Sequence, residues 1–126
     1  MKADARTDIQ CISRLVKHIN SISEAFAVLN ISNINDYLAN NICQLATAQA
    51  ITNIHELKKK LREETLDKLP TLCKVRTKFV RNIASHDYDK LDFQIIFDRL
   101  KQLLNPAIIK ELERVQNELQ NNSKCN

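Results

Sequence analysis

Three residues that could take part in phosphate chemistry lie close together in the stretch RNIASHDY, residues 81–88. His86 follows Arg81 by five positions, and Tyr88 lies two positions further on. An arginine stays charged, and its planar fork matches the oxygens of a phosphate. A histidine titrates near neutral pH and can accept or donate a proton without a metal ion.

Together, an arginine and a histidine suffice to cleave RNA. The imidazole of His86 would remove the proton from a 2′-hydroxyl, and the 2′-oxygen would attack the adjacent phosphorus. Arg81 would stabilise the extra negative charge of the five-coordinate transition state. We expect no metal and no cofactor, because the chain lacks the carboxylate cluster of a two-metal nuclease and contains no glycine for a phosphate-binding loop.

The same octet also has a purely structural interpretation. Histidine is common at helix ends, where its positive form complements the helix dipole. On an ideal helix Arg81 and His86 are about 140° apart, so their side chains diverge. They can meet if the helix ends near Ser85, or if two copies of the chain pair about a two-fold axis.

Positive charge is concentrated just before the octet. Residues 56–81 contain nine Lys or Arg against four acidic residues, whereas the rest of the chain is nearly neutral. On a helix running into the octet, Lys74 and Lys78 would lie on the same side as Arg81. This pattern indicates either a solvated helix face or an anion site such as a contact surface for an RNA backbone.

The composition predicts an all-α fold. The 126 residues include no glycine and only two prolines, which favours helices joined by short polar loops. Apolar spacing predicts an antiparallel up-and-down bundle of four to five helices in one domain, residues 1–120, and a disordered tail, residues 121–126. A spare apolar stripe on the first or last helix could serve a dimer. The expected helices span residues 4–29, 35–61, 71–85, a segment that begins after the capping residue Asp92, and a segment that begins at Pro106.

Particular apolar positions are expected to face the interior. On the second predicted helix these are Leu38, Ile42, Leu45, Ile54, Leu57 and Leu61. Cys11, Cys43 and Cys73 are expected in or near the core as reduced thiols, while Cys125 belongs to the polar tail. No apolar run suits a membrane span or a signal peptide, so a cytoplasmic location is expected.

From about Asn35 to Val115 the chain resembles the HEPN superfamily, and within it the HepT-like ribonucleases of toxin–antitoxin pairs. The resemblance is carried by an RNxxxHxY pattern, by the upstream LPTLCKVRTKFVRN and by the acidic helix start at Asp92. The matching motif residues are Arg81, Asn82, His86 and Tyr88. One departure is AITNIHEL in the second helix, where many relatives carry a Gly-Glu-Ala stretch. His55 in that stretch and His18 on the first helix are interpreted as structural.

The resemblance implies a homodimer whose Arg–His motifs line a shared cleft, and a metal-independent endoribonuclease activity in which Arg81 and His86 are catalytic and Asn82 supports them. It implies an antitoxin partner, a nucleotidyltransferase of the MNT type that can attach AMP to Tyr88. RNA is the expected nucleic acid, and neither DNA nor membrane is an expected partner. The alternative is a non-catalytic helical subunit that binds and regulates such a nucleotidyltransferase.

Overall fold

The structure, a computed structural model, describes residues 4–78 and 91–124, with side chains up to residue 122. Every regular element within these residues is a helix, which confirms the predicted all-α class. The helices are α1 (Ala5–Val28), α2 (Ile34–Leu38), α3 (Asn41–Lys60), α4 (Glu63–Leu66), α5 (Pro70–Cys73), α7 (Phe93–Leu103) and α8 (Pro106–Lys124).

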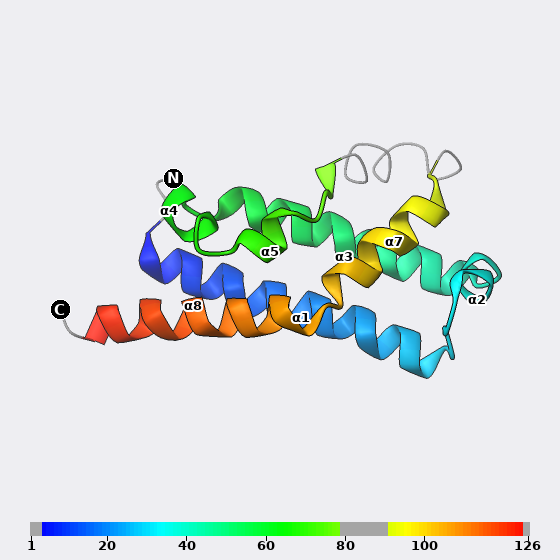
Figure 1. Cartoon of the computed structure of the whole chain (residues 1–126), viewed down its shortest axis with the longest axis horizontal. Coiled ribbons are helices and arrows are strands. Elements are labelled where there is room, and N and C mark those ends of the chain that lie inside the picture. Colours follow the sequence, from blue (N-terminus) through cyan, green and yellow to red (C-terminus); the bar gives the residue numbers. More distant parts are fainter. Residues whose placement is uncertain (1–3, 79–90, 125–126) are drawn as a thin grey trace.

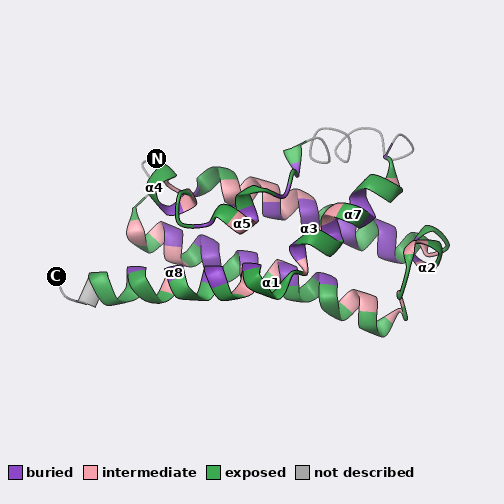
Figure 2. Ribbon diagram, viewed as in Figure 1, coloured by how far each residue is buried: buried purple, intermediate pink, exposed green. Residues whose placement is uncertain are grey.

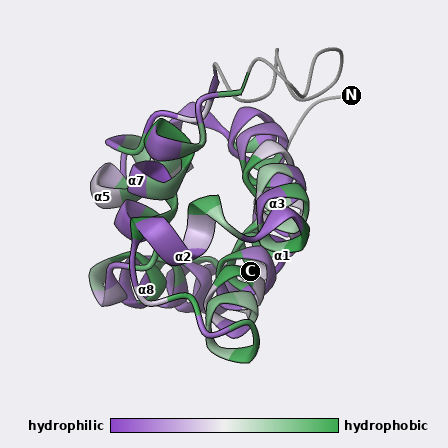
Figure 3. Cartoon of the chain, turned by 90° about the vertical axis from the view of Figure 1, so that its right-hand side faces the viewer, coloured by the Kyte–Doolittle hydropathy of each residue, from purple (hydrophilic) through white to green (hydrophobic). Residues whose placement is uncertain are grey.

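Three long helices form the frame of the fold. Both α3 and α8 pack along α1 and run in the opposite direction to it (Figure 1). The shorter α7 contacts α2 and α3, and α5 contacts α8. Seen along the long axis, α1 and α3 lie on one side of the molecule, and α5, α7 and α8 lie on the other (Figure 3).

Polar caps define where four of these helices begin. Asp4, Asn33 and Asn40 each accept a hydrogen bond from the backbone N–H three residues later, at 2.8, 2.9 and 2.8 Å. Asp92 accepts from the backbone N–H groups of residues 94 and 95, as its predicted capping role requires. Such caps satisfy backbone donors that have no partner inside the helix.

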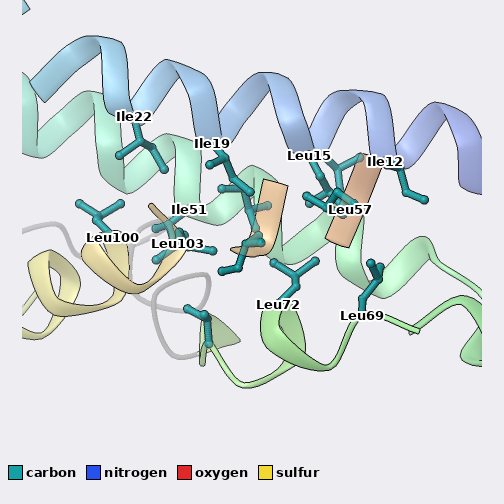
Figure 4. Close-up of a cluster of buried hydrophobic side chains, with 14 of the residues drawn as sticks. Ile12, Leu15, Ile19, Ile22, Ile51, Leu57, Leu69, Leu72, Leu100 and Leu103 are labelled. Atoms are coloured by element: carbon teal, nitrogen blue, oxygen red, sulfur yellow. The ribbon is translucent and has the colours of Figure 1, made fainter. Parts of the chain in front are cut away.

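Buried apolar side chains gather on the helix faces that look toward the interior (Figure 2). Side chains of α1 point toward those of α3, α5 and α7 in the core (Figure 4). The predicted inner face of α8 is confirmed, because Ile108, Leu112, Val115 and Leu119 are all buried. Burying each such side chain contributes about 1.5–3 kcal/mol. In α1 the centre of the buried face is formed by Leu15, Ile19 and Ile22.

The prediction of one helix over residues 35–61 is wrong. The chain forms α2 and α3, which are separated at residues 39–40, where Asn40 caps the second of them. The predicted inward positions Leu38, Ile42 and Leu45 are instead exposed, Ile42 by 70%. The reason is geometric, since steps of three and four through Cys43, Thr47, Ile51, Ile54 and Leu57 define another face.

The prediction of one helix over residues 71–85 is also wrong in its first part. Helix α5 ends at Cys73, and residues 74–77 are not helical. Lys78 is helical again, and the remainder of the predicted helix, from residue 79, lies outside the described residues. Lys74 and Lys78 therefore do not lie on one continuous helix with a common face.

Two smaller expectations also change. Helix α8 continues to Lys124, so most of the predicted disordered tail is helical, while residues 125 and 126, including Cys125, lie outside the described residues. Cys11 and Cys43 are buried as expected, but Cys73 is exposed. In the single turn of α5 the buried side chain is Leu72, while the Cys73 Sγ lies 3.6 Å from the carbonyl oxygen of Leu66.

A buried carboxylate holds the chain where it leaves α3. Asp8 is fully buried on α1. Its carboxylate accepts a hydrogen bond from the Arg62 side chain at 2.7 Å and another from the Arg62 backbone N–H at 3.3 Å. It also accepts a hydrogen bond from the Thr65 hydroxyl. The contacts span 54 and 57 residues of sequence. They join the first turn of α1 to the turn between α3 and α4.

We expect Asp8→Ala to destabilise the protein by about 2–3 kcal/mol, because it leaves Arg62 and Thr65 without their acceptor. This is slightly below the usual cost of breaking a buried ion pair, since the Arg62 side chain is partly exposed. Urea unfolding measures the change. The matched control is Glu24→Ala, an exposed carboxylate on the same helix, which should change stability by less than about 0.5 kcal/mol. Equal stability of the two variants would contradict the role assigned to Asp8.

Candidate functional site: a basic groove before the motif

The predicted catalytic residues Arg81 and His86, the supporting Asn82 and the predicted modification site Tyr88 all lie outside the described residues. The structure does describe the segment that leads into them. Cys73 and residues 75–78 border a cavity of about 660 Å³ together with the C-terminal half of α3. We call this cavity the Lys58 groove. Its described lining residues are His55, Lys58, Lys59, Leu66, Cys73, Val75, Arg76, Thr77 and Lys78.

Two polar contacts hold the non-helical segment against α3. The Lys58 Nζ donates a hydrogen bond to the carbonyl oxygen of Val75 at 3.0 Å. The His55 Nδ1 lies 2.8 Å from the Thr77 hydroxyl oxygen, in a hydrogen bond whose direction depends on the imidazole tautomer. The Lys58 ammonium thus gives a hydrogen-bond partner to a backbone carbonyl that has left the helix, and His55 fixes the Thr77 side chain.

Burial alternates along this segment. Val75 and Thr77 are buried, whereas Arg76 and Lys78 are exposed. An alternation of two residues is typical of an extended chain, which agrees with the absence of helix over residues 75–77, and Lys78 is helical again. The buried side chains of Val75 and Thr77 anchor the segment, and the exposed cations Arg76 and Lys78 remain at the groove.

The charged side chains of the described groove lining are all basic. Lys59 lies 4.0 Å from Glu56 on the same helix, at the limit of an ion pair. Neither Arg76 nor Lys78 pairs with any carboxylate in the part of the chain that the structure describes. Three cations, Lys58, Arg76 and Lys78, thus contribute positive potential to one concave surface.

Lys58 differs from the exposed lysines. Burial lowers the pKa of its ammonium group below the usual 10.5, against a smaller opposite effect of the Cys73 thiol. Its hydrogen bond to Val75 uses one of its three N–H donors. Burial removes part of the water around the Lys58 ammonium group. An anion that binds there would interact with it more strongly than with an ammonium group in water.

The two predicted RNA-binding lysines differ in position. Lys78 lines the groove, whereas Lys74 is exposed at the end of α5 and is not among the lining residues. The sequence does not single out Arg76 or Lys58, because a continuous helix would place Arg76 on another face than Arg81. Lys58 is part of the KKK run, whose clustered charge was the available signal.

His18 lies in a smaller, polar cavity of about 190 Å³ between α1 and α3, with Arg14, Asn53 and Lys60 among its neighbours. Burial, followed by the positive charges of Lys17 and Arg14, lowers the pKa of its imidazole. His18 is therefore half-buried between two helices, separate from the Lys58 groove. A structural role for His18 stays a prediction.

Within residues 4–78 and 91–124, no group of three His, Cys, Asp or Glu side chains is arranged to hold a metal ion. No described helix combines the length and apolar character that crossing a membrane requires. Comparison of the chain with protein families, curated proteins and solved structures finds no match. The likeness to HepT-like ribonucleases therefore stays a prediction that depends on the motif residues.

We expect the Lys58 ammonium to lose its proton at a lower pH than an ordinary lysine, because desolvation disfavours its charged form. In the unfolded chain Lys58 keeps the usual pKa. Between the lower pKa of the folded protein and this usual pKa, the unfolded chain binds more protons, so the free energy of unfolding rises as the pH rises. Carbon-13 NMR of labelled lysine side chains, titrated into the alkaline range, measures this pKa. The Lys58→Arg variant identifies the signal. A Lys58 midpoint at or above 10.5 would contradict desolvation as the dominant influence on this ammonium group.

Proposed function

We propose that this protein is a metal-independent endoribonuclease toxin of a toxin–antitoxin pair, with Arg81 and His86 as its catalytic residues. The observation that carries the proposal is the RNxxxHxY spacing at residues 81–88, directly after the most basic part of the chain. The helices would form an antiparallel bundle that pairs about a two-fold axis, so that the motifs of two subunits line one cleft.

The Lys58 groove supports this proposal through its position along the chain. Lys78 lines the groove, and Arg81 follows three residues later. Three residues of chain span at most about 11 Å, whatever conformation they adopt. A polyanion bound in the groove would therefore lie within reach of the Arg81 side chain. One RNA strand of several nucleotides could then contact the groove and Arg81 at the same time.

The proposed reaction is a transesterification within RNA. His86, in its neutral form, takes the proton of the 2′-hydroxyl, and the 2′-oxygen forms a bond to phosphorus. The bond between phosphorus and the 5′-oxygen breaks, and that oxygen receives a proton as it leaves. Arg81 binds the phosphate oxygens and stabilises the charge that develops on them. The products are a 2′,3′-cyclic phosphate and a 5′-hydroxyl, and no divalent ion takes part.

Control of this activity would come from a nucleotidyltransferase partner. Transfer of AMP to the hydroxyl of Tyr88 would place a negatively charged, bulky group two residues from His86. That group would compete with RNA for Arg81 and exclude the substrate from the cleft. Asn82, next to Arg81 in the chain, would support the arginine in this site.

We expect His86→Ala to abolish RNA cleavage in excess EDTA, because the general base is lost, while the parent protein remains active. Loss of a general base typically lowers the rate by about 100- to 10,000-fold. Gel analysis of a labelled RNA, with chemical identification of the cyclic phosphate end, measures the reaction. The matched control is His18→Gln, which removes a histidine outside the proposed site and should keep the activity. Full activity of the His86 variant would disprove the catalytic assignment.

A second candidate function is a non-catalytic subunit that binds a nucleotidyltransferase. It is favoured by the exposed apolar side chains of Leu38, Ile42 and Leu45, since a surface of this kind suits a protein partner. Such a subunit would keep Tyr88 as the residue that is modified and would have no activity on RNA alone.

We expect Tyr88→Phe to prevent the gain of an AMP group when the protein is incubated with its nucleotidyltransferase and ATP, because the acceptor oxygen is missing. Intact-protein mass spectrometry measures the modification. The matched control is Tyr37→Phe, which keeps Tyr88 and removes a hydroxyl that is buried against Thr47. Modification without any RNA cleavage by the unmodified protein would favour the second function. Modification of the Tyr88 variant would show that another residue is the acceptor.

A further inference from the structure

The Lys58 groove combines a size, a charge and a lining that suit one class of ligand. Its volume of about 660 Å³ lies within the range of cavities that hold nucleotide-sized ligands. Its described lining comes from the end of α3, from Leu66 of α4, from Cys73 and from residues 75–78. The contacts of Lys58 and His55 hold residues 75–77 against α3.

The described lining of the groove combines charged and apolar side chains. The three cations Lys58, Arg76 and Lys78 meet no carboxylate on this lining. The partly buried Leu66 contributes apolar surface to the same groove. A simple anion would need only the cations, and an apolar ligand would need only the apolar part.

A single strand of RNA presents both features in alternation. Its phosphates suit ammonium and guanidinium groups, and its bases offer flat faces that pack on apolar or planar side chains. The guanidinium of Arg76 can serve either part, because it is charged and planar. We propose that the Lys58 groove binds a single-stranded RNA segment, with its phosphates at Lys58, Arg76 and Lys78 and a base against the apolar lining.

The inference rests on the proposed function in one respect, namely that the ligand is RNA. It adds which residues bind the substrate beside the scissile bond, and it assigns that role to Arg76 and Lys58. An acidic protein surface would also be attracted by three cations. RNA is favoured, because a recessed groove of this volume admits a flexible strand more readily than a folded protein surface.

The test measures binding without cleavage. The probe is a short, fluorescent, single-stranded 2′-O-methyl RNA, which has no free 2′-hydroxyl and cannot react. We expect Arg76→Gln and Lys78→Gln each to weaken binding and to lower the slope of log K against log salt by about 0.7, as for the loss of one phosphate contact. Fluorescence anisotropy over a series of salt concentrations gives both quantities.

Matched controls separate a local contact from a change in net charge. Lys17→Gln on α1 and Lys110→Gln on α8 remove the same charge from exposed positions outside the groove and should leave affinity and slope unchanged. Lys58→Gln should also weaken binding, but it removes the hydrogen bond to Val75 as well. For that reason the variants of Arg76 and Lys78 decide the outcome.

The outcomes distinguish this inference from the proposed function. If the Arg76 and Lys78 variants bind the probe as tightly as the parent, the groove is not an RNA site, even where His86→Ala abolishes cleavage. If they lose affinity for an acidic protein partner but not for RNA, the inference is likewise overturned. Groove-dependent binding by a protein that cleaves no RNA would support the groove and reject the nuclease.

Discussion

The position of a single buried carboxylate determines how the rest of the chain can be arranged. Asp8 on the first turn of α1 binds Arg62 and Thr65, so the chain leaves α3 at a fixed place and direction. A buried charge is tolerated only when it is paired and fully hydrogen-bonded, and Asp8 accepts three such bonds. Because this turn is held, the segment that follows it returns along α3 and does not extend into solvent.

The returning segment contains little regular structure, and side chains from other helices supply its hydrogen-bond partners. Glu111 of α8 accepts from the backbone N–H groups of Thr71 and Leu72 at 3.2 Å each, where the short α5 begins. Further along, Lys58 and His55 hold residues 75–77. A single helical turn is not stable alone, so its geometry depends on these long-range contacts and on burial of Leu72.

This arrangement connects the fold to the proposed chemistry. The anchored residues Val75 and Thr77 alternate with exposed Arg76 and Lys78, so one short segment both packs against α3 and presents cations. A helix at the same place would have distributed those cations around its axis. The non-helical course of residues 74–77 gathers them with Lys58 on one groove, a few residues before Arg81. Recognition of a phosphate chain needs several cations at separate points along one path, and this segment provides them.

Much of the fold could be predicted from the sequence because local signals determine it. The absence of glycine, the Asp92 cap, the Asn105-Pro106 start and the regular apolar spacing of α8 act within a few residues, and the structure follows them. The octet at residues 81–88 and the basic charge before it were likewise visible from residue types alone. The tertiary structure decided which face of α3 is buried, since Ile42 and Leu45 match helical spacing as well as Ile51 does. It also decided that the chain leaves the helix after Cys73, because the partners that make this possible, Lys58, His55 and Glu111, lie 17 to 40 residues away in sequence.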